Sequence, residues 1–334
     1  MSKTPPVTVI MPILNEEAHL VDSVNRILAQ EYVGTLDVVL AVGPSKDRTR
    51  EVAEELARVS DRVTVVDNPT GRTPAGLNAA IAASTGEVIV RVDGHAMIPS
   101  DYVAIAVETL ERTGADNVGG IMAAEGVTDF GCAVARAMTS KFGVGGASFH
   151  VGGGEGPALT VYLGTFRRNA LDRVGGYDET MVRAQDWEMN LRIRETGGLI
   201  WFTPQMLVTY RPRATVGALS RQYHDYGRWR REVVRRHPET LSLRYLAAPV
   251  AVAAIAIGIL LAILGLVIGQ QWLTIIGLIP PIVYVLANVL ASMVSALTAP
   301  RLRLRSALWL PVVYGTMHLT WGAGFLRGGA GRDS

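Results

Sequence analysis

Short apolar runs alternate with amphipathic stretches over the first 120 residues of the chain. Four of the runs have the length and the β-branched content of buried strands: residues 7–11, 37–42, 63–66 and 87–92. Between them, apolar residues recur three and four positions apart, as on one face of a helix. Strands that alternate with helices form a parallel sheet with right-handed crossovers, so the pattern predicts an α/β fold.

The last third of the chain has a different pattern, because charged residues are missing from long stretches of it. No Asp, Glu, Lys or Arg occurs from Tyr245 to Pro300. A membrane-spanning helix needs about 20 apolar residues, so this stretch has room for two spans, at about 245–268 and 272–297. Residues 307–326 form a third candidate, which either crosses the membrane or re-enters it. Long buried helices of a soluble protein are the alternative, but a soluble core rarely needs so long an uncharged stretch.

Positive charge flanks these apolar segments. Residues 221–244 hold seven arginines against three acidic residues, and Arg301, Arg303 and Arg305 separate the second and third candidate spans. Loops rich in Lys and Arg lie on the cytoplasmic side of a membrane. The N-terminus has no signal peptide, so we expect the first 220 residues to be cytoplasmic. The predicted location is the plasma membrane, with more than one crossing.

These patterns divide the chain into four parts. We expect a cytoplasmic α/β domain (1–220), a basic and aromatic segment at the membrane surface (221–244), a transmembrane region (245–326) and a short tail (327–334). In the segment 221–244, arginines are interleaved with tyrosines and a tryptophan, which suits lipid headgroups and phosphates. The alternative is a helix that only anchors the domain, and binding to nucleic acid is excluded by the attachment to a membrane.

Polar residues follow each of the four predicted strands. Ligands of parallel α/β sheets bind outside the carboxyl ends of the strands. We therefore expect this edge of the sheet to bind a polar ligand. The residues concerned are Pro12, Asn15 and Glu16 after the first strand, Ser45 and Asp47 after the second, the stretch "NPTGRTPAGLN" with Asn78 after the third, and Asp93 and His95 after the fourth.

A nucleotide bound at this edge needs a counter-charge for its phosphates. Neither G-x-G-x-x-G nor G-x-x-x-x-G-K-[ST] occurs in a convincing context. Asp93 and His95 offer an indirect solution, because they can hold a divalent metal that bridges the phosphates. The alternative is that both residues only close a turn. Cys132 is the single cysteine, which excludes an intramolecular disulfide and a cysteine metal cluster.

A second acidic candidate is Asp186 in "MVRAQDWEMNLRIRETGG". It is expected in the first turn of a helix, where an isolated Asp commonly serves as a cap. The alternative is a catalytic base, which the site otherwise lacks.

Taken together, the sequence motifs resemble those of a known protein family. The order "PILNEE", "GPSKDRT", "RTPAGLNAAI", "VRVDGH", "VYLGTFRR", "GGYDE" and "RAQDWEMNLRIRETGG" is similar to glycosyltransferase family 2, in particular its succinoglycan-biosynthesis glucosyltransferase-like subgroup. The resemblance covers about residues 7–231. It implies a Rossmann-like GT-A fold, a nucleotide-sugar donor, a divalent metal (Mn²⁺ or Mg²⁺) and inversion at the anomeric carbon.

The resemblance also implies roles for individual residues. Asp186 matches the catalytic base, although Gln185 replaces the glutamate that usually precedes it. Asp93 and His95 match the metal-binding Asp-x-Asp motif in its Asp-x-His form. The donor pocket would include Pro12, Asn15, Glu16, Asp47, Asn78 and Asp93. The acceptor or the diphosphate would bind to Gln222, Arg228, Trp229, Arg230 and Arg231. The spacing from Gln222 to Arg228 and Trp229 is longer than in the family's Gln-x-x-Arg-Trp motif.

The resulting hypothesis is an inverting, metal-dependent transfer of sugar from a nucleoside diphosphate, preferably UDP, to a polyprenyl-diphosphate-linked saccharide. Direct transfer to a polyprenyl phosphate is the alternative. A transporter with a regulatory nucleotide-binding domain is a remote third hypothesis, since the candidate spans contain no charged residue that would mark an ion path. A nucleotidyltransferase is disfavoured because "PILNEE" lacks a phosphate-binding loop.

Overall fold

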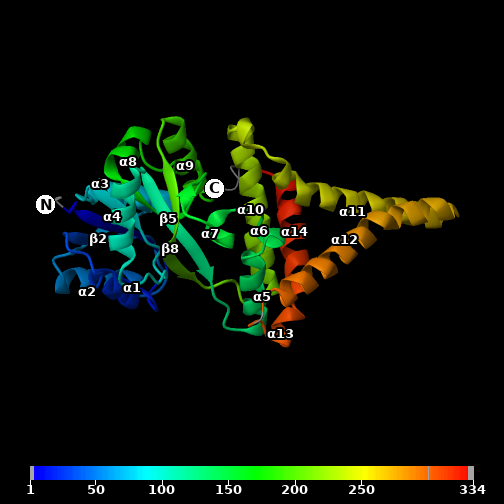
Figure 1. The fold of residues 1–334 in the computed structure, drawn as a ribbon, viewed down its shortest axis with the longest axis horizontal. Coiled ribbons are helices and arrows are strands. Elements are labelled where there is room, and N and C mark those ends of the chain that lie inside the picture. The colour runs from blue at the N-terminus through cyan, green and yellow to red at the C-terminus, as the bar shows by residue number, and fades with distance from the viewer. Residues whose placement is uncertain (1–3, 300, 330–334) are drawn as a thin grey trace. The chain divides into compact units, whose positions relative to one another are not determined.

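The computed structural model describes residues 4–299 and 301–329, which form two compact units (Figure 1). The sheet unit comprises residues 4–123 and 147–210, and the helical unit comprises residues 124–146 together with the chain from Arg211 onward. The boundary therefore differs from the one expected at residue 220. Residues 124–146 belong to the helical unit because the helix within them, α5 (Asp129–Met138), packs against α13 (Leu304–Ala307) and α14 (Leu310–Arg327) of that unit.

The sheet unit is built on one mixed sheet of eight strands in the order β3-β2-β1-β4-β7-β5-β8-β6. The four strands expected from the sequence are present, and they pair in parallel as predicted. The other half is antiparallel: β7 pairs with β4 and β5, and β6 pairs with β8. The strands are β1 (Val7–Ile13), β2 (Leu36–Val42), β3 (Val63–Asp67), β4 (Val88–Arg91), β5 (Asn117–Ala124), β6 (Gly156–Pro157), β7 (Tyr162–Arg167) and β8 (Ile200–Tyr210).

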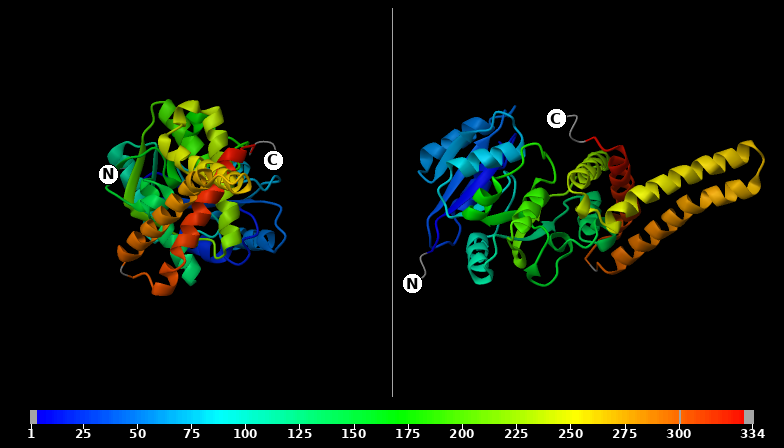
Figure 2. Two further views of the ribbon diagram at one scale, coloured as in Figure 1. Left: turned by 90° about the vertical axis from the view of Figure 1, so that its right-hand side faces the viewer. Right: turned by 90° about the horizontal axis from the view of Figure 1, so that it is seen from above.

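Helices cover both faces of this sheet (Figure 2). Side chains alternate between the faces of a strand, so neighbouring residues of β1 enter different cores. Val9 packs with residues of α1, α2 and α4, whereas Ile10 packs with residues of α3, α8 and α9. The helices of the unit are α1 (Leu20–Leu28), α2 (Thr49–Val59), α3 (Thr73–Ala83), α4 (Tyr102–Thr113), α7 (Ser148–Val151), α8 (Arg168–Val174) and α9 (Gln185–Glu195).

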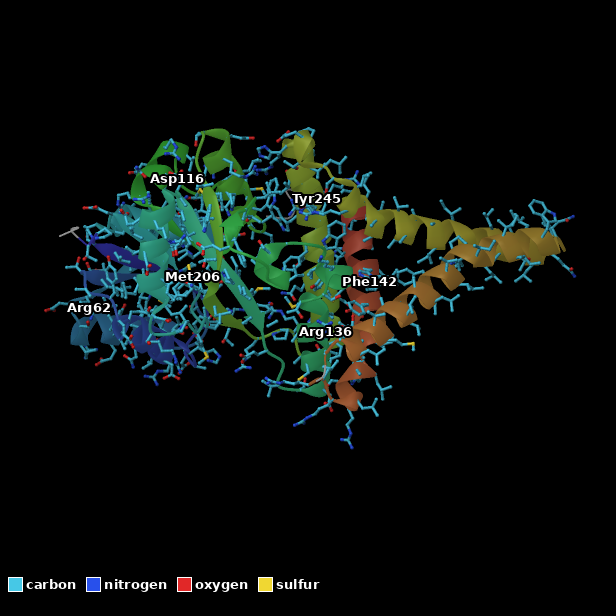
Figure 3. The ribbon with its side chains drawn as sticks, viewed as in Figure 1. Arg62, Asp116, Arg136, Phe142, Met206 and Tyr245 are labelled. Carbon is cyan, nitrogen blue, oxygen red and sulfur yellow. The ribbon has the colours of Figure 1, made fainter. Side chains whose placement is uncertain are left out.

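The helical unit contains the two helices long and apolar enough to cross a membrane among the described residues, α11 (Leu243–Val267) and α12 (Gln271–Leu297). Their bounds match the first two predicted spans closely. Only 17% and 11% of their most apolar windows are buried, so neither resembles the core helix of a soluble protein. Their side chains project outward along both helices (Figure 3). The two backbones pack closely at Gly258 and Gly277, where an added Cβ would lie about 2.5 Å from the facing carbonyl oxygen.

The third predicted span behaves differently. Residues 307–326 fall on α13 (Leu304–Ala307) and α14 (Leu310–Arg327), and neither is a candidate span in the part of the chain that the structure describes. Instead α14 packs along α10 (Val216–Arg236). The approach is close because glycines lie at the contact: a Cβ on Gly227 or Gly324 would lie 2.0 Å from a carbonyl oxygen of the other helix. The apolar face of α14 is thus in contact with a helix rich in arginine, and a third crossing or re-entry stays a prediction.

Candidate functional site

The candidate site lies at the carboxyl end of β4 in the sheet unit. Arg91 is the last residue of this strand, and Asp93 and His95 follow it. Strand alternation sends Ile89 into the core that faces α9, and Arg91 follows two residues later on the same side. Asp186 lies in the first turn of α9, as predicted. The structure therefore brings together two acidic residues that are 93 positions apart in the sequence.

One arginine connects the two acids. The Nε and Nη2 atoms of Arg91 both donate to Oδ1 of Asp93, at 3.1 Å and 3.0 Å, and its Nη1 pairs with Oδ1 of Asp186. The Arg91 side chain is only 5% exposed. Sequence reasoning missed this residue, although an arginine inside the apolar run "EVIVRV" is a usable signal. A buried arginine needs carboxylate partners, and Asp93 was already the nearest candidate.

The charges of this triad shift one another's pKa values. Burial raises the pKa of Asp186, and the nearby guanidinium of Arg91 offsets only part of that effect. Burial opposes the charge of Arg91, but Asp186 and Asp93 outweigh it and raise the pKa of Arg91 well above its usual value. Arg91 therefore stays charged. A carboxylate with a raised pKa holds a proton more tightly, which favours its use as a general base.

His95 is held by a different acid. Its Nδ1 lies 2.7 Å from Oε1 of Glu16, across the chain from β1. The residue between Asp93 and His95 has to be small, because a Cβ on Gly94 would lie 2.8 Å from Cγ of Glu16. If the ring proton is on Nδ1, the hydrogen bond to Glu16 leaves the lone pair on Nε2. This is the usual arrangement for a histidine that binds a metal, in which a carboxylate orients the ring.

The residues present fit a divalent metal. Oδ2 of Asp93 accepts no hydrogen bond from any residue in the ranges 4–299 and 301–329, because Arg91 engages only Oδ1. One carboxylate oxygen and one imidazole nitrogen suit Mn²⁺, whereas Mg²⁺ prefers oxygen ligands. Glu16 was expected in the donor pocket. In the structure its carboxylate contacts His95, and the donor-pocket role stays a prediction.

The loops after β1 and β2 are joined to each other next to this cluster. The backbone amide of Asn15 donates to Ser45 Oγ at 3.0 Å, and Oδ1 of Asn15 accepts from the amide of Lys46 at 2.7 Å. Asp47 accepts from the hydroxyl and amide of Thr49 and from the amide of Glu17. The hydrogen bond from the Thr49 hydroxyl is the main cause of the lowered pKa of Asp47.

A cavity of about 420 Å³ opens between the ends of β2 and β3. Its lining includes Pro44, Ser45, Asp47, Arg50 and Asp67. Asp47, one of the residues predicted for the donor pocket, therefore borders this cavity, as does Ser45 of the same loop. Pro12 lies one strand away, paired with Ala41 at the end of β1.

Asn78 has a structural role in the sheet unit. Its amide nitrogen donates to the carbonyl of Tyr177 and to Glu179, and its amide oxygen accepts from the amide of Tyr177. These bonds attach α3 to the loop after α8. Both ends of the amide are engaged in this way, and the contact of Asn78 with the donor stays a prediction.

The arginines of α10 bind the end of a neighbouring helix. Arg228 donates to the carbonyls of Gly328 and Gly329, and Arg231 donates to those of Phe325 and Leu326. The last carbonyls of a helix have no partner within it, so these arginines complete the C-terminus of α14. The structure thus gives them a structural role, and their role in binding the acceptor stays a prediction.

The other predicted residues of α10 are also engaged within the helical unit. The guanidinium of Arg230 lies 4.4 Å from the centre of the Tyr245 ring. Trp229 and Gln222 are both buried, and Nε2 of Gln222 donates to the hydroxyl of Tyr226. These contacts make α10 a packing helix of its unit.

Comparison with known proteins places these features in context. The family model described as "Glycosyl transferase family 2" matches residues 8–175. Succinoglycan biosynthesis protein ExoA of Rhizobium meliloti is 34% identical over 321 residues, which cover 96% of this chain and 93% of that protein. A Methanococcus voltae protein named dolichyl N-acetyl-alpha-D-glucosaminyl phosphate 3-beta-D-2,3-diacetamido-2,3-dideoxy-beta-D-glucuronosyltransferase is 22% identical, over 69% of this chain and 74% of that one.

The fold also has a solved counterpart. Mannosyltransferase PcManGT from Pyrobaculum calidifontis, crystallised with GDP-Man and Mn²⁺, superimposes with a TM-score of 0.60 at 19% identity. The match covers 97% of this chain and 88% of that one. At this identity the likeness supports the GT-A fold of the sheet unit.

Proposed function

Because the chain belongs to glycosyltransferase family 2, we propose that it transfers a sugar from a nucleoside diphosphate to a lipid-linked acceptor, with inversion at the anomeric carbon and with a divalent cation. One observation carries this proposal. The acids of the expected metal motif and of the expected base share one buried arginine at the carboxyl edge of the sheet, and the histidine of the metal motif is oriented by Glu16.

The chemistry follows from the two acids. Asp93 and His95 would hold Mn²⁺ or Mg²⁺, which supplies positive charge to the diphosphate as the sugar leaves it. Asp186 accepts the proton of the acceptor hydroxyl as that oxygen attacks. General-base assistance of this kind is worth about 10²–10⁴-fold. Attack from the face opposite the leaving group inverts the anomeric centre.

The donor binds beside the joined loops of β1 and β2. The cavity between β2 and β3 is of a size for a nucleoside, and Asp47 and Asp67 border it with polar oxygens. We favour UDP as the nucleotide on the resemblance of the motifs. The solved PcManGT was crystallised with GDP-Man, so the test below includes guanine nucleotides as well.

The acceptor is lipid-linked, because a soluble acceptor needs no membrane helices. Two helices in the described part of the chain are long and apolar enough to cross a membrane, and the Methanococcus relative carries dolichyl phosphate in its name. Two crossings return the chain to the side where it entered. The arginines after α12 favour the cytoplasm for that side, and thus for the sheet unit. A polyprenyl-diphosphate-linked saccharide is our first choice of acceptor, and polyprenyl phosphate itself is the second.

The acceptor phosphate has a better candidate site than α10. Arg301 and Arg303 follow α12 and line a cavity of about 580 Å³ together with Thr128, Cys132 and Ser306. Neither guanidinium group has a hydrogen bond or an ion pair with any residue that the structure describes. Arginines at the end of a membrane helix attract anionic headgroups. We therefore assign the lipid phosphate to this cavity of the helical unit.

Thermal stabilisation in detergent tests the proposal. Purified protein is heated with UDP-glucose, UDP-GlcNAc, GDP-mannose and dTDP-glucose, each with Mn²⁺ or with chelator. We expect at least one nucleotide sugar to raise the melting temperature in Mn²⁺, and Asp93→Ala to abolish the rise. Asp61→Ala, an exposed acid in the turn before β3, is the matched control and keeps it. Equal stabilisation of wild type and Asp93→Ala in chelator would remove the metal role.

A further inference from the structure

We propose that Arg91 is a positioning residue: it holds one oxygen of Asp93 and one oxygen of Asp186, so that each carboxylate presents its second oxygen to its own partner. Asp93 would present Oδ2 to the metal, and Asp186 would present Oδ2 to the acceptor hydroxyl. The inference rests on the proposed function, because it assumes those two roles. It adds a third residue, which supports donor and acceptor chemistry together.

The hydrogen bonds divide the oxygens in this way. Nε and Nη2 of Arg91 converge on Oδ1 of Asp93, and Nη1 pairs with Oδ1 of Asp186. Within residues 4–299 and 301–329, no donor is bonded to Oδ2 of either acid. Each carboxylate is thus fixed at one oxygen, and its other oxygen can still bind a ligand.

Exposure distinguishes the arginine from the acids. The side chains of Asp93 and Asp186 are 24% and 27% exposed, whereas that of Arg91 is 5% exposed. Substrates can therefore reach both carboxylates but not the guanidinium. For this reason Arg91 acts through the two acids and does not touch the reacting atoms itself.

The local structure explains why an arginine is required. Ile89 and Arg91 point to the same face of the sheet, and Ile89 packs in the core that contains Met189 and Ile193 of α9. Arg91 is thereby aimed at the first turn of α9, where Asp186 lies. A guanidinium is planar and carries its donors in a fixed fork, so it can serve two carboxylates at once. A lysine keeps the charge but has a single point of attachment.

A double-mutant cycle tests the connection to Asp186. Release of nucleoside diphosphate is followed at saturating donor and saturating Mn²⁺, using the nucleotide sugar that stabilises the wild-type protein, for wild type, Arg91→Lys, Asp186→Asn and the double variant. We expect Arg91→Lys to lower kcat by about 100-fold, the loss that a displaced catalytic group typically causes. In the Asp186→Asn background the same change should have almost no further effect, because the base to be positioned is already lost.

Binding of Mn²⁺ alone tests the connection to Asp93 without any turnover. Loss of a residue that orients a metal ligand typically weakens metal binding by 10–100-fold. We expect Arg91→Lys to weaken Mn²⁺ binding, measured by calorimetry, within this range. Arg173→Lys is the matched control, because Arg173 pairs with Asp116 in the same unit and does not contact Asp93. If Arg91→Lys fails to fold, Arg91→Gln serves in its place, since it retains a planar amide donor.

The outcomes separate this inference from the function on which it rests. Turnover of Asp186→Asn at the wild-type rate ends the assignment of the base, and this inference with it. A large loss in Asp186→Asn, together with a full further loss on adding Arg91→Lys, ends the inference alone. A lower melting temperature of Arg91→Lys with unchanged kcat and Mn²⁺ affinity also overturns it, since Arg91 would then only stabilise the fold.

Discussion

The arginine at the sheet edge and the arginines of α10 differ in the kind of chemical group to which they are bonded. At the carboxyl edge of the sheet, Arg91 is buried and is bonded to two acids whose side chains are 24% and 27% exposed. In the helical unit, Arg228 and Arg231 are bonded to the carbonyls that end α14. Arg91 holds two acidic side chains of the proposed site, whereas Arg228 and Arg231 bind backbone carbonyls at the end of a helix. A sequence segment rich in charged residues therefore does not identify a binding site until the partners of those residues are known.

The largest effect is expected at the sheet edge. Asp186→Asn should lower kcat by about 10²–10⁴-fold and leave nucleotide binding intact, because the amide cannot take the proton. Initial rates at saturating donor, with binding measured by calorimetry, provide the check. Glu195→Gln, an exposed acid on the same helix, is the control and should behave like wild type. A loss smaller than about tenfold would mean that another residue is the base.

The next largest effect is expected at the two arginines that follow α12 in the helical unit. Changing Arg301 and Arg303 together to Gln should raise the KM for a lipid-linked acceptor by about 30-fold, since each headgroup contact is worth roughly 1 kcal/mol. The donor KM should not change. Arg305→Gln, on α13 and outside the cavity lining, is the matched control. If the acceptor KM of the double variant equals that of wild type, these arginines act only in membrane orientation, and the phosphate binds elsewhere.

The arginines of α10 should affect stability and not catalysis. Replacing Arg228 and Arg231 by Ala removes hydrogen bonds to the end of α14, each worth about 1 kcal/mol. The melting temperature in detergent should fall, while both KM values stay the same. Arg221→Ala, an exposed residue of the same helix, should have little effect on either quantity. A raised acceptor KM at unchanged melting temperature would restore the lipid-binding role first expected for α10.

The smallest effect is a shift in the pH dependence. Because burial raises the pKa of Asp186 above 3.8, this group gains its proton at a higher pH than an ordinary aspartate. As the pH falls, kcat should therefore decline earlier than it would for an exposed carboxylate. The measurement is kcat against pH at saturating donor and metal. Under these conditions the acidic decline should be absent from the residual activity of Asp186→Asn.

The parallel half of the fold and most of the site edge could be predicted from the sequence. Apolar runs located the first four strands, and parallel strands place their carboxyl ends on one edge, so Asp47 and Asp93 were expected near each other. The position of Asp186 at the start of a helix was also predicted. The antiparallel strands were not, because β6 has only two residues and β8 pairs with segments far from it in the chain.

The sequence could not predict which residue or helix a given segment contacts in the folded protein. Asn78 follows a strand end like Asn15, but its amide bonds to Tyr177, 99 residues away. Residues 307–326 are apolar enough to suggest a span, yet their partner is α10. Both outcomes depend on which surfaces meet in three dimensions. Gly227 and Gly324 indicate that two helices pack closely. The sequence does not indicate which helix each glycine contacts.

The central claim is that Asp93 and His95 hold the metal beside Asp186. The most direct measurement is the anomalous scattering of Mn²⁺ in crystals of the protein grown with Mn²⁺ and a nucleoside diphosphate. The account predicts one strong peak within coordination distance of Asp93 Oδ2 and His95 Nε2 and of the diphosphate oxygens, with Arg91 still bonded to Oδ1 of Asp93. A peak bound to the diphosphate but away from both residues, or a bound diphosphate with no metal peak, would contradict it.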